Sequence, residues 1–172
     1  MPLGRLTTGF LAVASTAVLL TAGVASSAAA AAPPDVTVYV QNFHSGKCAA
    51  VPGGIATRKT QLVQWNCDPF GTNRQWSRHA VGLDHYGNWI YILKNVKTKQ
   101  CLTSAGRTGG PVWQYPCSNG ANQRWSYDNA LRLHSNSSGD CLAVPGAQKG
   151  DGVKLIHWRC GTGYEQKWDM GK

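Results

Sequence analysis

Apolar residues recur at alternate positions ahead of one cysteine in each of three similar segments of the chain. They stand ten and eight positions before that cysteine, as Val38 and Val40, Tyr91 and Leu93, and Leu131 and Leu133. A period of two is typical of a β-strand with one buried face. The pattern therefore predicts a strand leading toward each of Cys48, Cys101 and Cys141.

These three segments are copies of one repeat, which runs from Val38 to Trp76, from Tyr91 to Trp125 and from Leu131 to Trp168. Each copy has a second cysteine, with an aromatic residue two positions before it and a tryptophan eight or nine positions after it. The aromatic residues are Trp65, Tyr115 and Trp158, and the tryptophans are Trp76, Trp125 and Trp168. An internal repeat of this kind indicates that three similar units build the fold.

Each repeat contains about four short strand candidates, separated by turn signals of the Pro-Gly, Gly-Gly and Asn-Gly type. These signals are Pro52-Gly53-Gly54, Gly109-Gly110, Asn119-Gly120 and Pro145-Gly146. A lone unit cannot bury both its tryptophan and its aliphatic residues, so we expect about twelve strands, in three units that share one core around a pseudo-threefold axis. We expect the tryptophan that ends each repeat to lie in that core; these are Trp76, Trp125 and Trp168. The longer segment between Trp76 and Tyr91 predicts a surface insertion or a longer hairpin.

Composition supports a single all-β domain. The chain has 172 residues with 20 Gly, 8 Pro and 7 Trp, which is unlike a helical bundle rich in Ala, Leu, Glu and Lys. Seventeen Lys and Arg against eight Asp and Glu give a net charge of +9. The basic residues are dispersed, which is typical of a solvated surface, and no nucleic-acid recognition motif accompanies them. We expect no nucleic-acid partner and keep affinity for acidic polysaccharide as a minor hypothesis.

Residues 1–31 have the pattern of a secretory signal peptide: a basic start, an apolar stretch and a run of small residues that ends at Ala32. A membrane anchor is the alternative, but the apolar stretch contains Ser, Thr and Gly and runs into an Ala-x-Ala cleavage pattern. We expect a secreted, extracellular protein with no membrane anchor after cleavage. A short linker at 32–35 leads to one domain at 36–172, with repeats at about 36–78, 89–127 and 130–170.

All six cysteines follow the signal segment, and an even number in an exported protein implies disulfides. The two cysteines of each repeat are separated by 18, 15 and 18 residues, so each pair can close one short loop. This spacing predicts the disulfides Cys48–Cys67, Cys101–Cys117 and Cys141–Cys160. A zinc site is the alternative, but the sequence lacks Cys-x-x-Cys and exported thiols rarely stay reduced. We therefore expect no metal and no cofactor.

The repeats resemble the ricin B-type lectins, a family similar to carbohydrate-binding module family 13. The resemblance rests on Gln-x-Trp endings, which read Gln123-Arg124-Trp125 and Gln166-Lys167-Trp168 here, whereas the first repeat reads Arg74-Gln75-Trp76. It covers residues from about 36 to 172 and implies a β-trefoil of three four-stranded repeats. The sequence CLAVPG, which begins at Cys141, and the Ala-rich signal segment resemble those of secreted actinobacterial members of the family.

The resemblance implies one galactose-type or other sugar site per repeat. Such a site uses an Asp two residues after the first cysteine, the aromatic residue, an Asn and the Gln of Gln-x-Trp, because a pyranose stacks on an aromatic ring and needs fixed polar groups around it. The acid is missing, since Ala50 and Ala143 occupy its place in the first and third repeats, and Glu165 replaces the third Asn. The residues that fit, with the hydroxyl of Thr103 in place of the second acid, are Trp65, Asn73, Thr103, Tyr115, Asn122, Gln123, Trp158 and Gln166.

Some neighbouring residues have a second interpretation. Asp68, Asp140 and Asp151 are candidates to replace the missing acid, although turn roles are favoured for them. Gln123 and Gln166 are as fitted to bind backbone as to bind sugar. His157 adjoins Trp158 on a predicted strand and should point away from that ring. We expect the middle repeat, with the most complete set, to bind most strongly.

We predict a secreted, monomeric carbohydrate-binding domain with weak, multivalent affinity for a galactose- or xylose-type glycan. The sequence lacks Gly-x-Ser-x-Gly and His-Glu-x-x-His, and no pair of acids recurs in the repeats, so we predict that it is not an enzyme. The alternative is a trefoil with degenerate sugar sites that serves as a protein-binding or inhibitor scaffold. The missing acids favour this alternative, and the three retained aromatic residues argue against it.

Overall fold

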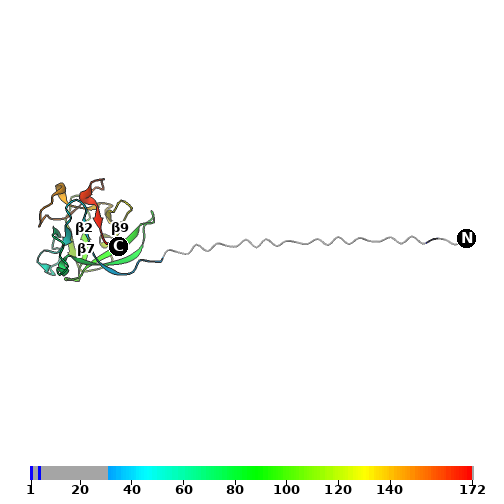
Figure 1. Ribbon diagram of the computed structural model, residues 1–172, viewed down its shortest axis with the longest axis horizontal. Coiled ribbons are helices and arrows are strands. Elements are labelled where there is room, and N and C mark those ends of the chain that lie inside the picture. Colours follow the sequence, from blue (N-terminus) through cyan, green and yellow to red (C-terminus); the bar gives the residue numbers. More distant parts are fainter. Residues whose placement is uncertain (2–3, 5–30, 172) are drawn as a thin grey trace. The chain divides into compact units, whose positions relative to one another are not determined.

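The computed structural model describes Met1, Gly4 and residues 31–171 (Figure 1). The predicted signal peptide therefore lies almost entirely outside the described residues. Within the described part, no helix combines the length and apolar character needed to cross a membrane.

Residues 31–171 form short β-strands joined by single turns of 3-10 helix. The strands are β1 (Val36–Tyr39), β2 (Gln41–Asn42), β3 (Cys48–Ala50), β4 (Val63–Trp65), β5 (Gln75–Leu83), β6 (Trp89–Asn95), β7 (Cys101–Ser104), β8 (Val112–Tyr115), β9 (Trp125–Tyr127), β10 (Leu133–Ser135), β11 (Cys141–Ala143), β12 (Ile156–Trp158) and β13 (Trp168–Asp169). The 3-10 turns are η1 (Pro52–Gly54), η2 (Thr72–Arg74), η3 (Ala121–Gln123), η4 (Pro145–Ala147) and η5 (Tyr164–Gln166).

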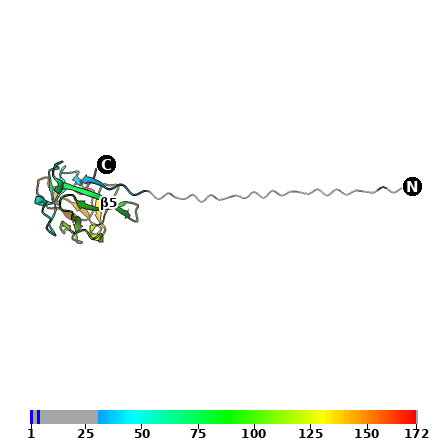
Figure 2. The same cartoon turned by 90° about the horizontal axis from the view of Figure 1, so that it is seen from below.

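All paired strands are antiparallel and belong to two sheets. One contains β1, β5, β6, β9, β10, β11 and β12 in this order, with β7 and β8 branching from β6, and the other has the order β13-β2-β3-β4. The pairing of β13 with β2 joins the last repeat to the first. In Figure 2 the long strand β5 can be followed beside the other strands of its sheet. The strand before Cys48 is split into β1 and β2, which explains thirteen strands in place of about twelve.

The core repeats three times. Trp76, Trp125 and Trp168 are fully buried, and each indole N–H donates to a main-chain carbonyl just after the first cysteine of its repeat. The acceptors are Ala49, Leu102 and Leu142, at 2.9, 3.0 and 2.9 Å. A buried tryptophan needs a partner for its N–H, so this bond sets the orientation of each ring. The three units therefore share one core, as the repeat pattern predicts.

The alternation of apolar residues holds at five of its six positions and is wrong at Leu131. Leu131 is 36% exposed and has a φ of 66°. Its N–H donates to the Asp128 carbonyl in the tight turn between β9 and β10, so it lies outside the strand. Only five residues separate Trp125 from Leu131, and the chain must reverse within them. The longer segment after Trp76 instead forms the β5–β6 hairpin, one of the two predicted alternatives.

The three predicted disulfides are confirmed. Their Cα–Cα distances are 5.2 Å for Cys48–Cys67, 5.1 Å for Cys101–Cys117 and 5.1 Å for Cys141–Cys160. Each one closes a loop within its own repeat, so the loops that follow β4, β8 and β12 are tied to β3, β7 and β11.

Buried amides join neighbouring repeats in two of three places. The Gln64 amide donates to the carbonyls of Gln148 and Gly150, and the Gln114 amide donates to those of Ile55 and Thr57. The third repeat has His157 at this position, also fully buried. Its Nδ1 lies 3.3 Å from an Asp140 oxygen, but its Nε2 has no partner among the described residues.

Candidate functional site

The predicted ring platforms lie at the ends of β4, β8 and β12. Trp65 is 41% exposed and Trp158 is 49% exposed, whereas Tyr115 is partly buried. Successive side chains of a strand point to opposite faces, and the residues before these rings, Gln64, Gln114 and His157, are fully buried. The alternation therefore turns the rings outward. His157 points away from Trp158 as predicted.

Glycines of neighbouring repeats support the two exposed indoles. A Cβ on Gly109 would lie 3.0 Å from the Trp158 ring, and one on Gly152 would lie 3.6 Å from the Trp65 ring. Both glycines have a φ near 80°, which side-chain-bearing residues rarely adopt. The Asp151-Gly152 turn and the Gly109-Gly110 turn are thus part of the platforms.

Trp65 forms one wall of a hollow of about 540 Å³ in the first repeat, here called the Trp65 hollow. The other walls include Pro52 and Gly54 of η1, Asn73 and Arg74 of η2, and Lys97 from the second repeat. The Asn73 amide donates to the Val51 carbonyl at 2.8 Å, which fixes its side chain at the rim. The polar and basic groups therefore share the rim with two apolar side chains, Pro52 and Phe70.

Arg74 occupies the position that Gln123 and Gln166 hold in the other repeats. Its guanidinium forms an ion pair with Asp68 at 3.0 Å, and this pair ties the loop after Cys67 to η2. The Asp68 carboxylate therefore stabilises the loop through this ion pair.

Trp158 forms one wall of the equivalent Trp158 hollow in the third repeat, with a volume of about 450 Å³. Pro145 and Ala147 of η4, together with Ile156, give it an apolar floor. Glu165 and Gln166 of η5 complete the rim. The acid therefore lies in this hollow at the position where the first repeat has Asn73.

The two matching glutamines are buried at 1% and 4% exposure and have partners for both polar atoms. Gln123 accepts from the Ser118 N–H and donates to the Pro116 carbonyl and to the Thr103 hydroxyl. Gln166 accepts from the Gly161 N–H and donates to the Arg159 carbonyl. Thr103 is also buried, and its hydroxyl donates to the Cys101 carbonyl. This geometry favours a supporting role for all three residues.

The middle repeat differs from the other two. Arg58 of the first repeat places its guanidinium carbon 5.9 Å from the centre of the Tyr115 ring. Asn122 lies partly exposed on η3. No Pro-Gly turn follows β7, where the chain reads Ser104-Ala105-Gly106. The residues of the most complete set in the sequence, Tyr115, Asn122 and Gln123, line neither of the two tryptophan hollows.

The other two candidate acids also hold loops. Asp140 is buried and accepts from the Thr108 hydroxyl at 2.7 Å. Asp151 pairs with Lys47 at 2.8 Å and accepts from the Asn66 N–H. Neither carboxylate lines the Trp65 hollow or the Trp158 hollow.

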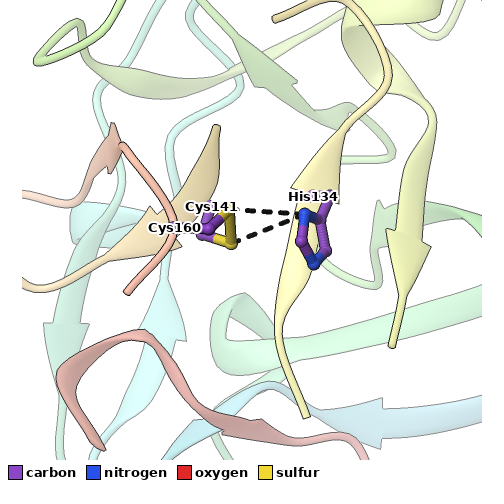
Figure 3. Close-up of side chains that lie close together, drawn as sticks. All are labelled: His134, Cys141 and Cys160. Atoms are coloured by element: carbon purple, nitrogen blue, oxygen red, sulfur yellow. Dashed lines mark hydrogen bonds between the residues drawn. A yellow bond between two sulfur atoms is a disulfide. The ribbon is translucent and has the colours of Figure 1, made fainter. Parts of the chain in front are cut away.

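His134 is a further candidate residue, which no sequence pattern predicted. It pairs with Cys141 across β10 and β11, and its Nδ1 lies 3.3 Å from Cys160 Sγ (Figure 3). The ring nitrogen and both sulfurs lie within 4.8 Å of one another. Because the two sulfurs are bonded to each other, they offer no thiolate to a metal.

A family model described as the ricin-type β-trefoil lectin domain matches residues 36–168. None of the curated protein sequences matches the chain.

Solved structures with the same architecture include the designed threefold-symmetric protein ThreeFoil, with a TM-score of 0.69 and 25% identity, covering 79% of this chain and 98% of that one. An exo-β-1,3-galactanase from Clostridium thermocellum has a TM-score of 0.69 and 28% sequence identity, and the match covers 80% of this chain but only 30% of the galactanase. The C-half of an earthworm R-type lectin in complex with GalNAc has a TM-score of 0.61 and 17% sequence identity, and the match covers 80% of this chain and 98% of that one. The fold is a β-trefoil, as predicted.

Proposed function

The chain belongs to the ricin-type β-trefoil lectin family, and on this premise we propose that it is a secreted carbohydrate-binding domain without catalysis of its own. The observation that carries the proposal is the pair of exposed tryptophans, each walling a hollow at an equivalent position of the trefoil. Hollows of about 450 and 540 Å³ accommodate one or two sugar residues.

The binding mode follows from the chemistry of the walls. The apolar face of a pyranose stacks on an indole, and its hydroxyls bond with the polar rim. In the Trp65 hollow the rim offers Asn73 and Lys97, and in the Trp158 hollow it offers Glu165. Neutral hydrogen bonds contribute roughly 0.5–1.5 kcal/mol each and hydrogen bonds to charged groups about 1.5–3 kcal/mol. With one or two bonds in each hollow, a monosaccharide dissociation constant near the millimolar range is expected.

Retention on a polymer then depends on valency. Two or three weak sites on one rigid body engage one polysaccharide chain together, and each later contact is intramolecular. The galactanase and the GalNAc-bound lectin among the similar structures support galactose-type glycans as the first to test, with xylose-type glycans as the second. Three disulfides support folding in an oxidising, extracellular compartment.

The test is retention on insoluble galactan and xylan, with displacement by the free sugar. Trp65→Ala, Tyr115→Ala and Trp158→Ala are compared singly and together. Tyr164→Ala serves as a control, because that exposed ring lies on none of the three platform strands and lines neither hollow. We expect graded losses, a collapse in the triple variant and retention in the control. Full retention in the triple variant would contradict the stacking mode, and absence of glycan binding by the wild type would favour a protein-binding scaffold.

A further inference from the structure

A cavity of about 600 Å³ lies outside the two tryptophan hollows. One wall comes from the tip of the β5–β6 hairpin, with Asp84, Tyr86 and Asn88. The other comes from β10 and the turn before it, with Asp128, Arg132 and His134. This cavity has no counterpart in the repeat pattern, because the segment that follows Trp76 has 14 residues before the next repeat and the segment that follows Trp125 has five.

The hairpin wall presents a free aromatic ring on a braced turn. The Asp84 carboxylate accepts from the N–H groups of Tyr86 and Asn88, both at 2.9 Å, and from the Asn88 amide at 3.1 Å. Burial acts to raise the pKa of Asp84, but the bonds from Asn88 and Tyr86 leave that pKa below its usual value, so the group is ionised. Tyr86 is 79% exposed, and the centre of its ring lies 3.6 Å from the centre of the His85 ring. The turn therefore holds the ring out from the core.

The opposite wall carries a second fixed carboxylate. Asp128 accepts from the Arg132 N–H at 2.8 Å and Nε at 2.9 Å, and lies 2.7 Å from His134 Nε2. Arg132 also donates to the Gly161 carbonyl at 3.0 Å. Burial acts to raise the pKa of Asp128, whereas the bonds from His134 and Arg132 lower it. The wall is thus polar and held in place before any ligand arrives.

We propose that this cavity is an additional saccharide subsite, which binds one neutral pyranose between the Tyr86 ring and the Asp84 and Asp128 carboxylates. Each carboxylate has one oxygen that accepts a single hydrogen bond, Oδ2 of Asp84 and Oδ1 of Asp128, so each can also accept from a sugar hydroxyl. The C–H face of a pyranose packs on an aromatic ring. The cavity has two ionised carboxylates, and its Arg132 is already paired with Asp128, so an anionic ligand is disfavoured. The polar walls disfavour an apolar ligand. Neither tryptophan hollow pairs an aromatic ring with two fixed carboxylates.

The inference extends the proposed carbohydrate binding to a surface outside the threefold set. Its test is a titration of the ¹⁵N-labelled full-length protein with methyl β-D-galactopyranoside and methyl β-D-xylopyranoside, followed by amide resonances. Gly87 reports on the cavity, because it lies between Tyr86 and Asn88. Gly54 and Gly146 report on the two tryptophan hollows.

We expect a saturable shift of Gly87 that persists in the Trp65→Ala/Trp158→Ala double variant. Tyr86→Ala should weaken this binding about tenfold, since it removes the stacking surface, whereas Tyr86→Phe should retain it. Tyr164→Ala is a control, because that exposed ring lies outside the cavity. Shifts confined to Gly54 and Gly146, or a Gly87 shift indifferent to Tyr86→Ala, would overturn the inference and leave the proposed function intact. Absence of shifts at all three glycines would overturn both.

Discussion

The Trp65 hollow of the first repeat and the Trp158 hollow of the third repeat share their frame but differ in the charge of their walls. Both place an exposed indole at the end of a strand, beside a turn that begins with Pro-Gly. Arg74 and Lys97 line the first, whereas Glu165 is the charged residue of the second. The repeat therefore sets where a ring is exposed, and residues that the core does not constrain set the charge beside it.

This difference has a consequence for ligand preference. Arg74 is paired with Asp68, and Lys97 forms no ion pair among the described residues. The Trp65 hollow therefore has uncompensated positive charge, which attracts a carboxylated or sulfated sugar, and the Trp158 hollow should favour a neutral one. The attraction is modest, because both hollows are open to water and salt.

Breaking the shared frame should have the largest effect. Cys48→Ala/Cys67→Ala and Cys141→Ala/Cys160→Ala each free the loop that follows a platform strand. We expect each double variant to lose about 2–5 kcal/mol in free energy of unfolding, because the unfolded chain regains loop entropy. Urea unfolding measures this loss. A loss below about 1 kcal/mol in either variant would show that its loop is held by other contacts.

Removing one ring should separate binding from stability. Trp65→Ala and Trp158→Ala should each weaken sugar binding by roughly 1–3 kcal/mol in calorimetric titration, as for a stacking residue. The free energy of unfolding should fall by about 1 kcal/mol or less, since 41% of Trp65 and 49% of Trp158 are already exposed to water. If the free energy of unfolding fell by as much as the free energy of sugar binding, the ring would be a packing residue.

His157→Gln should make the third repeat more like the first. The glutamine reproduces the Gln64 geometry, in which the amide donates to the loop of the neighbouring repeat. We expect a gain of about 0.5–1.5 kcal/mol in free energy of unfolding, because Nε2 of the His157 ring has no hydrogen-bond partner in the part of the chain that the structure describes. A loss of stability would show that the contact of His157 with Asp140 outweighs the missing bond.

The same variant should alter the pH dependence of stability. Burial lowers the pKa of His157 below 6.5, and the nearby Asp140 only partly opposes it. The unfolded chain therefore binds a proton that the folded chain does not, so stability is complete above about pH 6.5 and falls as the pH drops from there toward the folded-state pKa. Unfolding measured between about pH 7 and 5 should show this slope in the wild type and a smaller one in His157→Gln.

The charge of the Trp65 hollow should give the smallest effect. Lys97→Ala should weaken binding of a uronic-acid oligosaccharide by up to about 1 kcal/mol at low salt and leave binding of a neutral one unchanged. Lys94→Ala is a matched control, because that lysine does not line the hollow. The difference between the two glycans should disappear in about 1 M salt. A loss that salt does not affect would point to a hydrogen bond in place of a charge effect.

The fold was predictable from sequence because its signals are local. The two cysteines of one repeat are close along the chain, and each buried tryptophan follows the second cysteine by eight or nine positions. Spacing alone therefore predicts the loops and the core. Leu131 departs from the predicted strand because the turn before β10 has few residues and needs Leu131 with its positive φ. The apolar pattern contains no information on the length of that turn.

The sites were less predictable because their walls come from different repeats. Lys97 of the second repeat enters the Trp65 hollow, and Arg58 of the first approaches Tyr115 of the second. No spacing within one repeat reports such contacts. The cavity beside Tyr86 likewise joins the β5–β6 hairpin to the start of the third repeat. Sequence matching also could not show that Gln123 and Gln166 use both polar atoms to hold loops.

Stacking of sugar on Trp65 and Trp158 can be seen in a crystal structure of the protein at high concentration of a galactose- or xylose-containing disaccharide. We predict a pyranose ring packed face-on against each indole, with hydroxyls directed to Asn73 in one hollow and to Glu165 in the other. Two empty hollows that are open to solvent in the lattice, with sugar bound elsewhere or nowhere, would contradict it.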